Sequence, residues 1–444
     1  MTSNNMTHQN ILSNKLDRWV TYGIWIMIAL IYIPVPAISG TLITFMLFVL
    51  SLYSMNNETR GLALMCFAAP VLGALFFVLH IPLTAYFICL FLGLIFLRNY
   101  IKSNIGVNKE LIPFGLLIII FLIAYLYGPQ HSYSNSKLIY IISIGLCSII
   151  YWNVYLQSPK LQLLALAQFL CLISLLYLYI AFDFYPFKHP THIFDLDFFR
   201  GSFSLIKKST ATVLTYHSVG IPAMMGLALI FSSFKLSELR RKKVIIVMLP
   251  LIILLLIAQA RQAIFGTFII LFIRLIIDTN ISFNKKIGFS VILAFSSLFI
   301  ITNLRSDYME SAMNATTFSK SLNRNYDDAF KILETDFILG KGLGGFSTNG
   351  ARAYPHNLFL ELLCELGMVG TLLIIVLIFV PLLVKPNRFQ LMTKSNFYAL
   401  PLIVAIFIRS MMSSDLIDSI TLITAIIVIS NTQTNKLCQQ SLSI

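Results

Sequence analysis

Charged side chains are scarce in this sequence. Lys, Arg, Asp and Glu make up 11% of the 444 residues, hydrophobic residues make up 58%, and the mean hydropathy is +0.84. A water-soluble domain has about 25% charged residues, so this composition excludes one. It predicts an all-α polytopic membrane protein, because lipid offers the backbone no hydrogen-bond partners and helices satisfy their own.

Acidic residues are scarcer than basic ones, with 18 Asp and Glu against 32 Lys and Arg and a net charge of +14. We expect no nucleic-acid partner, because no basic patch is interleaved with aromatic side chains. In a membrane protein, Lys and Arg keep loops on the cytoplasmic side and contact anionic lipid. The charge therefore indicates membrane lipid as a partner.

Cysteine and histidine form no metal-binding pattern. Of the six cysteines, none lies in the long polar segments and no CxxC pair occurs. We therefore expect no disulfide framework, no metal and no cofactor. The polar residues 1–18 precede the first apolar run without a small-residue cleavage pattern, so we expect no cleaved signal peptide.

Long apolar runs fill most of the chain. A helix needs roughly 20 apolar residues to cross a membrane, and on this measure the chain forms a single integral membrane domain, 1–444, with about 12–14 transmembrane helices. The runs fall near 19–37, 39–55, 61–80, 81–97, 111–128, 138–156, 162–182, 209–233, 244–260, 262–278, 287–303, 356–384, 395–411 and 414–431.

Basic residues are concentrated in alternate loops, of which residues 240–243 are the densest example. With the N-terminus inside, the short basic loops face the cytoplasm, as the positive-inside rule requires. The C-terminus is then cytoplasmic as well. The two long polar segments, 183–208 and 304–355, face the periplasm.

The segment 304–355 contains a predicted amphipathic helix. Tyr326, Phe330, Leu333 and Phe337 recur at spacings of four, three and four residues, while charged side chains occupy the other faces. Such a helix can lie on the membrane–water boundary. The sequence GKGLGG that follows lacks the Gly-Lys-Ser/Thr of a phosphate-binding loop, so it indicates a tight return toward the membrane.

The sequence Pro355-His356-Asn357 is predicted to open the next apolar helix, because proline is favoured at the first helical position. His356 would then lie in the first turn, where the helix dipole keeps an imidazole neutral and attracts anions such as a diphosphate. A neutral imidazole can act as a general base. The alternative is a capping or interfacial histidine.

Two carboxylates, Glu361 and Glu365, lie in this apolar helix. Carboxylates within a membrane-spanning helix are costly and face a partner or a cavity. Either they are salt-bridged or protonated structural groups, or Glu361 lines an acceptor cavity together with Asn357. Gly367 and Gly370 are expected to permit close helix packing.

Three arginines lie on the predicted outer side: Arg200 in FFRGSF, Arg261 in IAQARQAIFG and Arg324 in LNRNY. A guanidinium offers a planar donor fork that suits phosphate oxygens. Each arginine alone fits an interfacial anchor better than a ligand-binding residue. Three of them on the same side as His356 favour an anionic ligand there.

These motifs together resemble the signature of the O-antigen polymerase and O-antigen ligase superfamily. The resemblance rests on Arg324, on GKGLGGF, and on PHNLFLELLCELGMVG, in which nine residues separate His-Asn from Gly-x-x-Gly. Arg261 matches the family's arginine at the start of an outer-facing helix, and Arg200 resembles the arginine of an earlier outer loop. The resemblance covers roughly residues 255–272 and 320–375.

The resemblance implies a metal-independent, inverting glycosyltransferase of the bacterial inner membrane, active in lipopolysaccharide or polysaccharide biosynthesis. It would transfer a glycan from undecaprenyl diphosphate to an acceptor hydroxyl on the periplasmic face. His356 would deprotonate the acceptor, and Arg261, Arg324 and Arg200 would bind the diphosphate, whose growing negative charge guanidinium groups stabilise. A chain-length regulator is a further partner that fits this activity.

The acceptor stays open. A polymerase adds the glycan to a lipid-linked repeat unit, a ligase adds it to lipid A core, and a third relative glycosylates pilin. The short stretch between Gly345 and His356 resembles that of a polymerase, which is the function we expect. A polysaccharide transporter or flippase is the non-enzyme alternative, because intramembrane charges and broken helices also line substrate paths.

Overall fold

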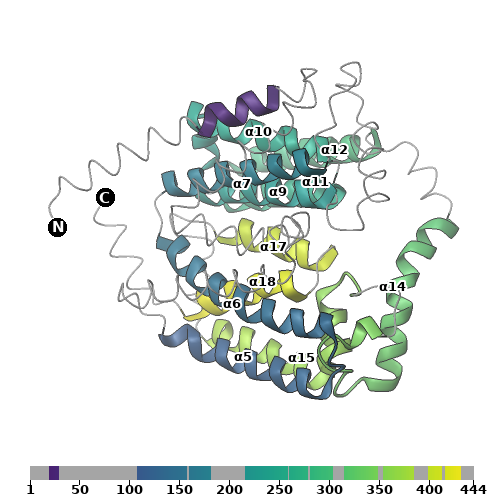
Figure 1. Ribbon diagram of the computed structural model, residues 1–444. Helices are drawn as coiled ribbons and strands as arrows, with labels where there is room; N and C mark the ends of the chain where they lie inside the picture. The colour runs from purple at the N-terminus through teal and green to yellow at the C-terminus, as the bar shows by residue number, and fades with distance from the viewer. Residues whose placement is uncertain are drawn as a thin grey trace. The chain divides into compact units, whose positions relative to one another are not determined.

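The computed structural model describes residues 20–29, 108–157, 160–181, 216–258, 260–278, 281–303, 315–348, 354–384, 399–412 and 416–431. Within these residues every regular element is a helix, which confirms the predicted all-α class there (Figure 1). The chain divides into two units. One comprises Met1–Gly61 and Ser158–Thr267, and the other comprises Leu62–Gln157 and Phe268–Ile444.

The first unit is built around α7. Its described helices are Val20–Ala29, α7 (Lys160–Ala181), α9 (Tyr216–Ser233), the short 3-10 helix η2 (Leu236–Arg240), α10 (Lys242–Ala258) and the start of α11 (Arg261–Ile277). The side chains of α7 are buried on every face from residue 163 to 178, as expected of a helix that is apolar all round. Both α9 and α10 pack against it.

The second unit contains the remaining described elements. They are α5 (Asn108–Tyr127), α6 (Ser132–Gln157), α12 (Phe283–Asn303), α14 (Ala315–Asp336), the 3-10 helix η3 (Gly345–Thr348), α15 (Leu358–Val384), α17 (Ala399–Met412) and α18 (Leu416–Asn431). Helix α18 packs against α5, α6, α15 and α17. Ser148 of α6 and Thr424 of α18 share a buried hydrogen bond of 2.6 Å between their hydroxyl groups.

Two described helical stretches, Ser132–Trp152 and Leu358–Val380, are long and apolar enough to cross a membrane. The other described apolar helices are shorter by the same measure, with 10–17 residues each. The predicted spans 39–55, 61–80 and 81–97, and the polar segment 183–208, lie outside the described residues.

Helix α14 occupies the segment for which the sequence predicts an amphipathic helix. Among its described side chains, Ala329 and Ile332 are buried and form a small core with Phe346 and Cys364. Phe330, on the predicted apolar face, is 55% exposed. The apolar face of α14 is therefore wider than the predicted stripe, because Ala329 and Ile332, outside that stripe, are apolar too. The side with Ala329 and Ile332 packs inward, whereas Phe330 stays uncovered.

Candidate functional site

Helix α15 begins with an asparagine cap. The side-chain oxygen of Asn357 accepts hydrogen bonds from the backbone N–H groups of Phe359 at 3.0 Å and Leu360 at 3.2 Å, and the helix starts at Leu358. The prediction that Pro355 takes the first helical position is wrong, because the asparagine satisfies the free N–H groups further along. His356 lies before the cap and not in the first turn.

The backbone of His356 has a left-handed conformation. Its φ is 59°, and it is the one non-glycine with positive φ among the described residues. The half-buried imidazole packs edge to face on Tyr354, with ring centroids 4.5 Å apart and an interplanar angle of 72°. Such a conformation costs of order 1–3 kcal/mol and is found mostly where the surrounding structure imposes it for function.

Further along, α15 is broken at Gly367, where φ is 64° and ψ is −173°. In an unbroken helix the N–H groups of Met368 and Val369 would donate to the carbonyl oxygens of Cys364 and Glu365. At the break these four groups bond elsewhere. Gly367 therefore does more than permit close packing of helices, which was its predicted role.

The segment 337–342 fills this break. The carbonyl oxygens of Phe337 and Ile338 accept the two freed N–H groups of α15, at 2.8 and 3.2 Å. The N–H groups of Lys341 and Gly342 donate to the two freed carbonyl oxygens, at 2.8 and 2.9 Å. These four backbone groups of the break are thus paired with the segment 337–342, which ties the glycine-rich loop to the helix that starts beside His356.

Glycine is required where this loop meets its neighbours. A Cβ atom on Gly340 would collide with the backbone of Gly367, and one on Gly342 would collide with the backbone of Gly128. Gly340 and Gly342 also have φ values of 70° and 80°, which residues with side chains rarely adopt. The predicted tight turn is therefore present and packs against the break in α15, whereas its return toward a membrane stays a prediction.

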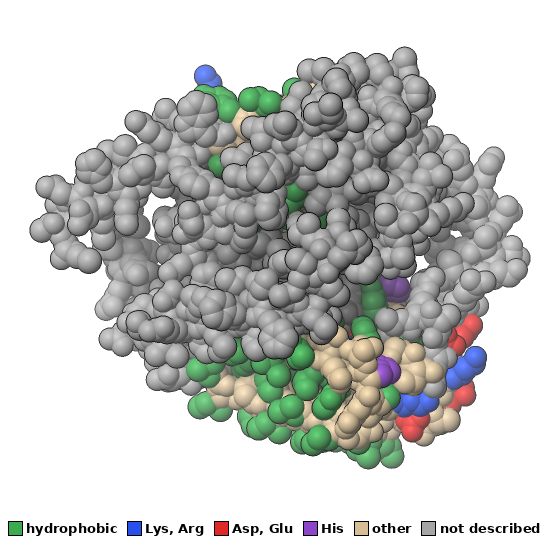
Figure 2. All heavy atoms as spheres, in the orientation of Figure 1, with side chains coloured by type: hydrophobic (Ala, Val, Ile, Leu, Met, Phe, Trp, Pro, Cys, Tyr) green, Lys and Arg blue, Asp and Glu red, His purple; other side chains and the backbone are tan. Residues whose placement is uncertain are grey.

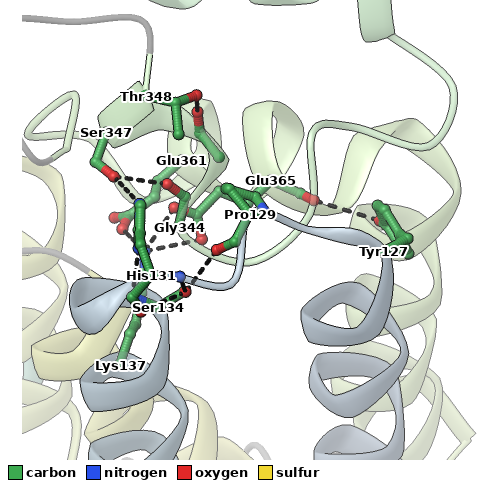
Figure 3. A network of polar contacts seen from close by, with 11 residues as sticks. Tyr127, Pro129, His131, Ser134, Lys137, Gly344, Ser347, Thr348, Glu361 and Glu365 are labelled. Atoms are coloured by element: carbon green, nitrogen blue, oxygen red, sulfur yellow. Dashed lines mark hydrogen bonds and ion pairs between the residues drawn. The ribbon is translucent and has the colours of Figure 1, made fainter.

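The turn between α5 and α6 contacts the same loop through His131 (Figure 3). The Nδ1 atom of His131 accepts the N–H of Ser134 at 3.0 Å, so the proton of a neutral ring lies on Nε2. Nε2 then donates to the hydroxyl of Ser347 at 2.8 Å, and that hydroxyl donates to Gly344 O at 2.8 Å. Sequence reasoning missed His131, although a histidine in a short polar turn between two apolar runs was a usable signal.

A buried ionic cluster joins α6 to α15. The ammonium of Lys137 donates to both carboxylate oxygens of Glu365, at 2.8 Å each, and to one oxygen of Glu361. All three side chains are 0% exposed. Of the alternatives for Glu361 and Glu365, the salt-bridged one holds, and Glu361 does not line an open acceptor cavity.

Lys137 was absent from the predicted site. The predicted apolar run began at residue 138, one position after it. Two carboxylates inside an apolar helix call for a cationic partner, and a lysine at the edge of another apolar run was the signal that could have identified it.

The arginines are placed only in part. Arg261 begins α11 in the first unit, and Arg324 lies within α14 in the second, but their side chains are outside the described residues. Arg200 lies outside the described residues altogether. The diphosphate site formed by these arginines stays a prediction.

Comparison of the chain with models of known protein families, with curated proteins and with solved structures gives no match.

Proposed function

We propose that the chain is a polytopic membrane protein of the bacterial inner membrane. The support is the apolar character of the uncovered helix faces. Helix α5 exposes Ile112, Ile119, Ile123 and Leu126, at spacings that place them on one side of the helix. Contiguous apolar faces of this kind are rare on proteins surrounded by water, and Figure 2 shows hydrophobic side chains gathered over the described part of this surface.

A similar face is exposed on α15. Met368, Leu372, Val376 and Phe379 are all uncovered in the part of this helix after Gly367, while Glu361 and Glu365, before the break, are buried against Lys137. A helix that exposes apolar side chains toward lipid and keeps its charged groups buried against a partner is the arrangement expected of a membrane bundle.

Within that membrane protein, we propose a glycosyltransferase of the O-antigen polymerase type. The observation that carries this proposal is the interlocking of its motifs. The loop GKGLGGF is inserted into α15 at the first glycine of Gly-x-x-Gly, and the same helix starts beside the left-handed His356. Residues that resemble the family signature thus form one structural unit, with a half-buried imidazole at its edge.

The proposed reaction is a single displacement. The imidazole of His356 takes the proton of an acceptor hydroxyl, and the oxygen bonds to the anomeric carbon of the donor glycan. The bond from that carbon to the undecaprenyl diphosphate breaks, and the diphosphate leaves with the bonding electrons. Guanidinium groups of Arg261, Arg324 and Arg200 would stabilise its additional charge, and inversion at the anomeric carbon follows from one displacement.

Deletion of the gene, followed by electrophoresis of the lipopolysaccharide, tests this function. A polymerase deletion leaves core with a single repeat unit, whereas a ligase deletion leaves core with none. Complementation with the intact gene should restore the ladder. Unchanged lipopolysaccharide, capsule and pilin glycan in the deletion strain would contradict the proposal.

A transporter is the second candidate, and two observations favour it. Broken helices and buried charges, such as the break at Gly367 and the cluster of Lys137, Glu361 and Glu365, occur along substrate paths. Here, however, the break is filled by segment 337–342 and the three carboxylate contacts occupy the ammonium. Movement of lipid-linked glycan across the membrane of vesicles, without transfer of glycan to an acceptor, would favour the transporter.

A further inference from the structure

The first turns of α6 contact the glycine-rich loop. His131, directly before the helix, donates to Ser347, and a Cβ atom on Gly344 would lie 2.8 Å from Cβ of Ser134. These contacts fix one side of the candidate site to the start of α6. They involve polar and backbone groups at the helix end, where the side chain of His131 is half-buried and that of Ser134 is buried.

Lys137 lies one helical turn beyond Ser134 and contacts α15. Its two partners, Glu361 and Glu365, are four residues apart, so they lie on one face of α15. The N–H of Glu361 donates to the carbonyl oxygen of Asn357 at 2.9 Å. Glu361 therefore lies one helical turn after Asn357, which directly follows His356. The cluster therefore joins α6 to the part of α15 that is nearest to His356.

Stability alone does not account for this cluster. Buried charges lose their hydration, and apolar side chains of similar volume often stabilise a protein at least as well. What the cluster provides is direction: an ammonium has three N–H groups, and here they meet three carboxylate oxygens on two successive turns of α15. Three bonds from one atom restrict both sliding and rotation of α15 against α6.

We propose that Lys137 is a positioning residue of the candidate site. Together with Glu361 and Glu365, it fixes the first two turns of α15 to α6, and so sets the place of His356 relative to the glycine-rich loop that α6 also contacts. This inference rests on the proposed function for its catalytic consequence, but the fixing of α15 can be measured without any glycan.

The decisive variant removes all charge from the cluster: Lys137→Met, Glu361→Gln and Glu365→Gln together. Because no buried charge is left unpaired, the variant is expected to fold. Polymer per unit of folded protein should fall by about tenfold to a hundredfold, since misplacement of a catalytic group by about 1 Å has an effect of that size. Amide hydrogen exchange over residues 354–366 should become faster, while α18 stays protected.

Two controls separate position from stability and from charge. Ser148→Ala with Thr424→Val removes a buried polar contact of α6 on its α18 side, and should leave polymer per folded protein unchanged. Glu361→Gln alone keeps an oxygen acceptor for the ammonium, so it should keep polymer within about threefold of the wild type. A loss in Glu361→Gln equal to that in the neutral triple variant would overturn the proposal, because charge and not position would then matter.

Unchanged exchange over residues 354–366 and wild-type polymer in the folded triple variant would also overturn it. If the triple variant does not accumulate, Lys137→Arg decides, because it keeps the charge while the N–H groups of a guanidinium lie in one plane and cannot reproduce the three directions of an ammonium. Faster exchange and reduced polymer are expected there too, and wild-type values contradict the proposal. If the variant protein shows faster exchange over residues 354–366 but deletion of the gene changes no glycan, the inference that Lys137 positions α15 stands. The proposed glycosyltransferase activity is then rejected.

Discussion

The backbone of Gly340 lies against the backbone of Gly367, and neither residue has room for a Cβ atom. One glycine belongs to the loop after α14 and the other to the break in α15. Their contact allows four backbone hydrogen bonds to pass between loop and helix. The position of the glycine-rich loop is therefore determined by backbone geometry, which a single methyl group can disturb.

This contact predicts a large effect for Gly367→Ala. The residue has a φ of 64°, and its Cβ atom would collide with Ile338 O. We expect a loss of roughly 1–3 kcal/mol in the free energy of unfolding, measured as a lower Tm of the purified protein in detergent. Gly115→Ala is the matched control, because no atom lies within 4 Å of the added Cβ, and it should leave the Tm unchanged or higher. Equal Tm values for the two variants would contradict the described break.

The basic loops predict the topology. Reporter fusions after Gly201 and Asn349 should give a periplasmic signal, and a fusion after Lys242 a cytoplasmic one, because basic loops stay on the cytoplasmic side. Paired reporters, one active on each side of the membrane, provide the control for expression. A cytoplasmic signal at Asn349 would reject a site that uses a lipid-linked donor on the periplasmic face.

The positions of helices were predictable because a long apolar run leaves the backbone few alternatives. The predicted run 138–156 corresponds to α6 at Ser132–Gln157, and the predicted run 162–182 to α7 at Lys160–Ala181. Helix ends were less predictable, since they depend on polar caps. At α15 the side chain of Asn357 outweighs the helix-start preference of Pro355.

The insertion of the loop into α15 was not predictable from sequence. Gly367 was visible as a glycine in a helix. Which segment pairs with the carbonyl and N–H groups that it frees depends on hydrogen bonds between residues 23 and 31 positions apart in the chain. The cluster of Lys137 with Glu361 and Glu365 has the same cause. Lys137 is separated from Glu361 and Glu365 by more than 220 residues, and α5 and α18, which both pack against α6 and α15, bring them together.

The proposed diphosphate site requires the planar shape of the arginine guanidinium as well as its positive charge. Arg261→Lys keeps the charge and loses the planar donor fork, so polymer should fall clearly. Loss of one charge-assisted hydrogen bond removes about 1.5–3 kcal/mol, which corresponds to roughly tenfold or more in rate. The assay is polymer per unit of membrane-inserted protein in a complemented deletion strain. Full activity in both Arg261→Ala and Arg324→Ala would reject the diphosphate site.

The last prediction concerns His356 and uses its unusual backbone. Asparagine tolerates a left-handed conformation better than most residues, so His356→Asn should preserve the turn before α15 and accumulate at the wild-type level. The side-chain amide of asparagine cannot accept a proton at neutral pH. If the imidazole is the general base, polymer should fall by about 100- to 10,000-fold, and His356→Gln should be almost equally inactive.

A purely structural histidine predicts the opposite pattern. Its role would be to form the turn and to pack on Tyr354, at a ring separation of 4.5 Å. His356→Asn would then remain active, because the turn is preserved, and Tyr354→Ala would lower the amount of folded protein to the same extent as His356→Ala. Measuring polymer per unit of folded protein for these variants distinguishes the two roles. Wild-type polymer from His356→Asn would remove the base from the proposed reaction and leave a left-handed turn that serves only to start α15.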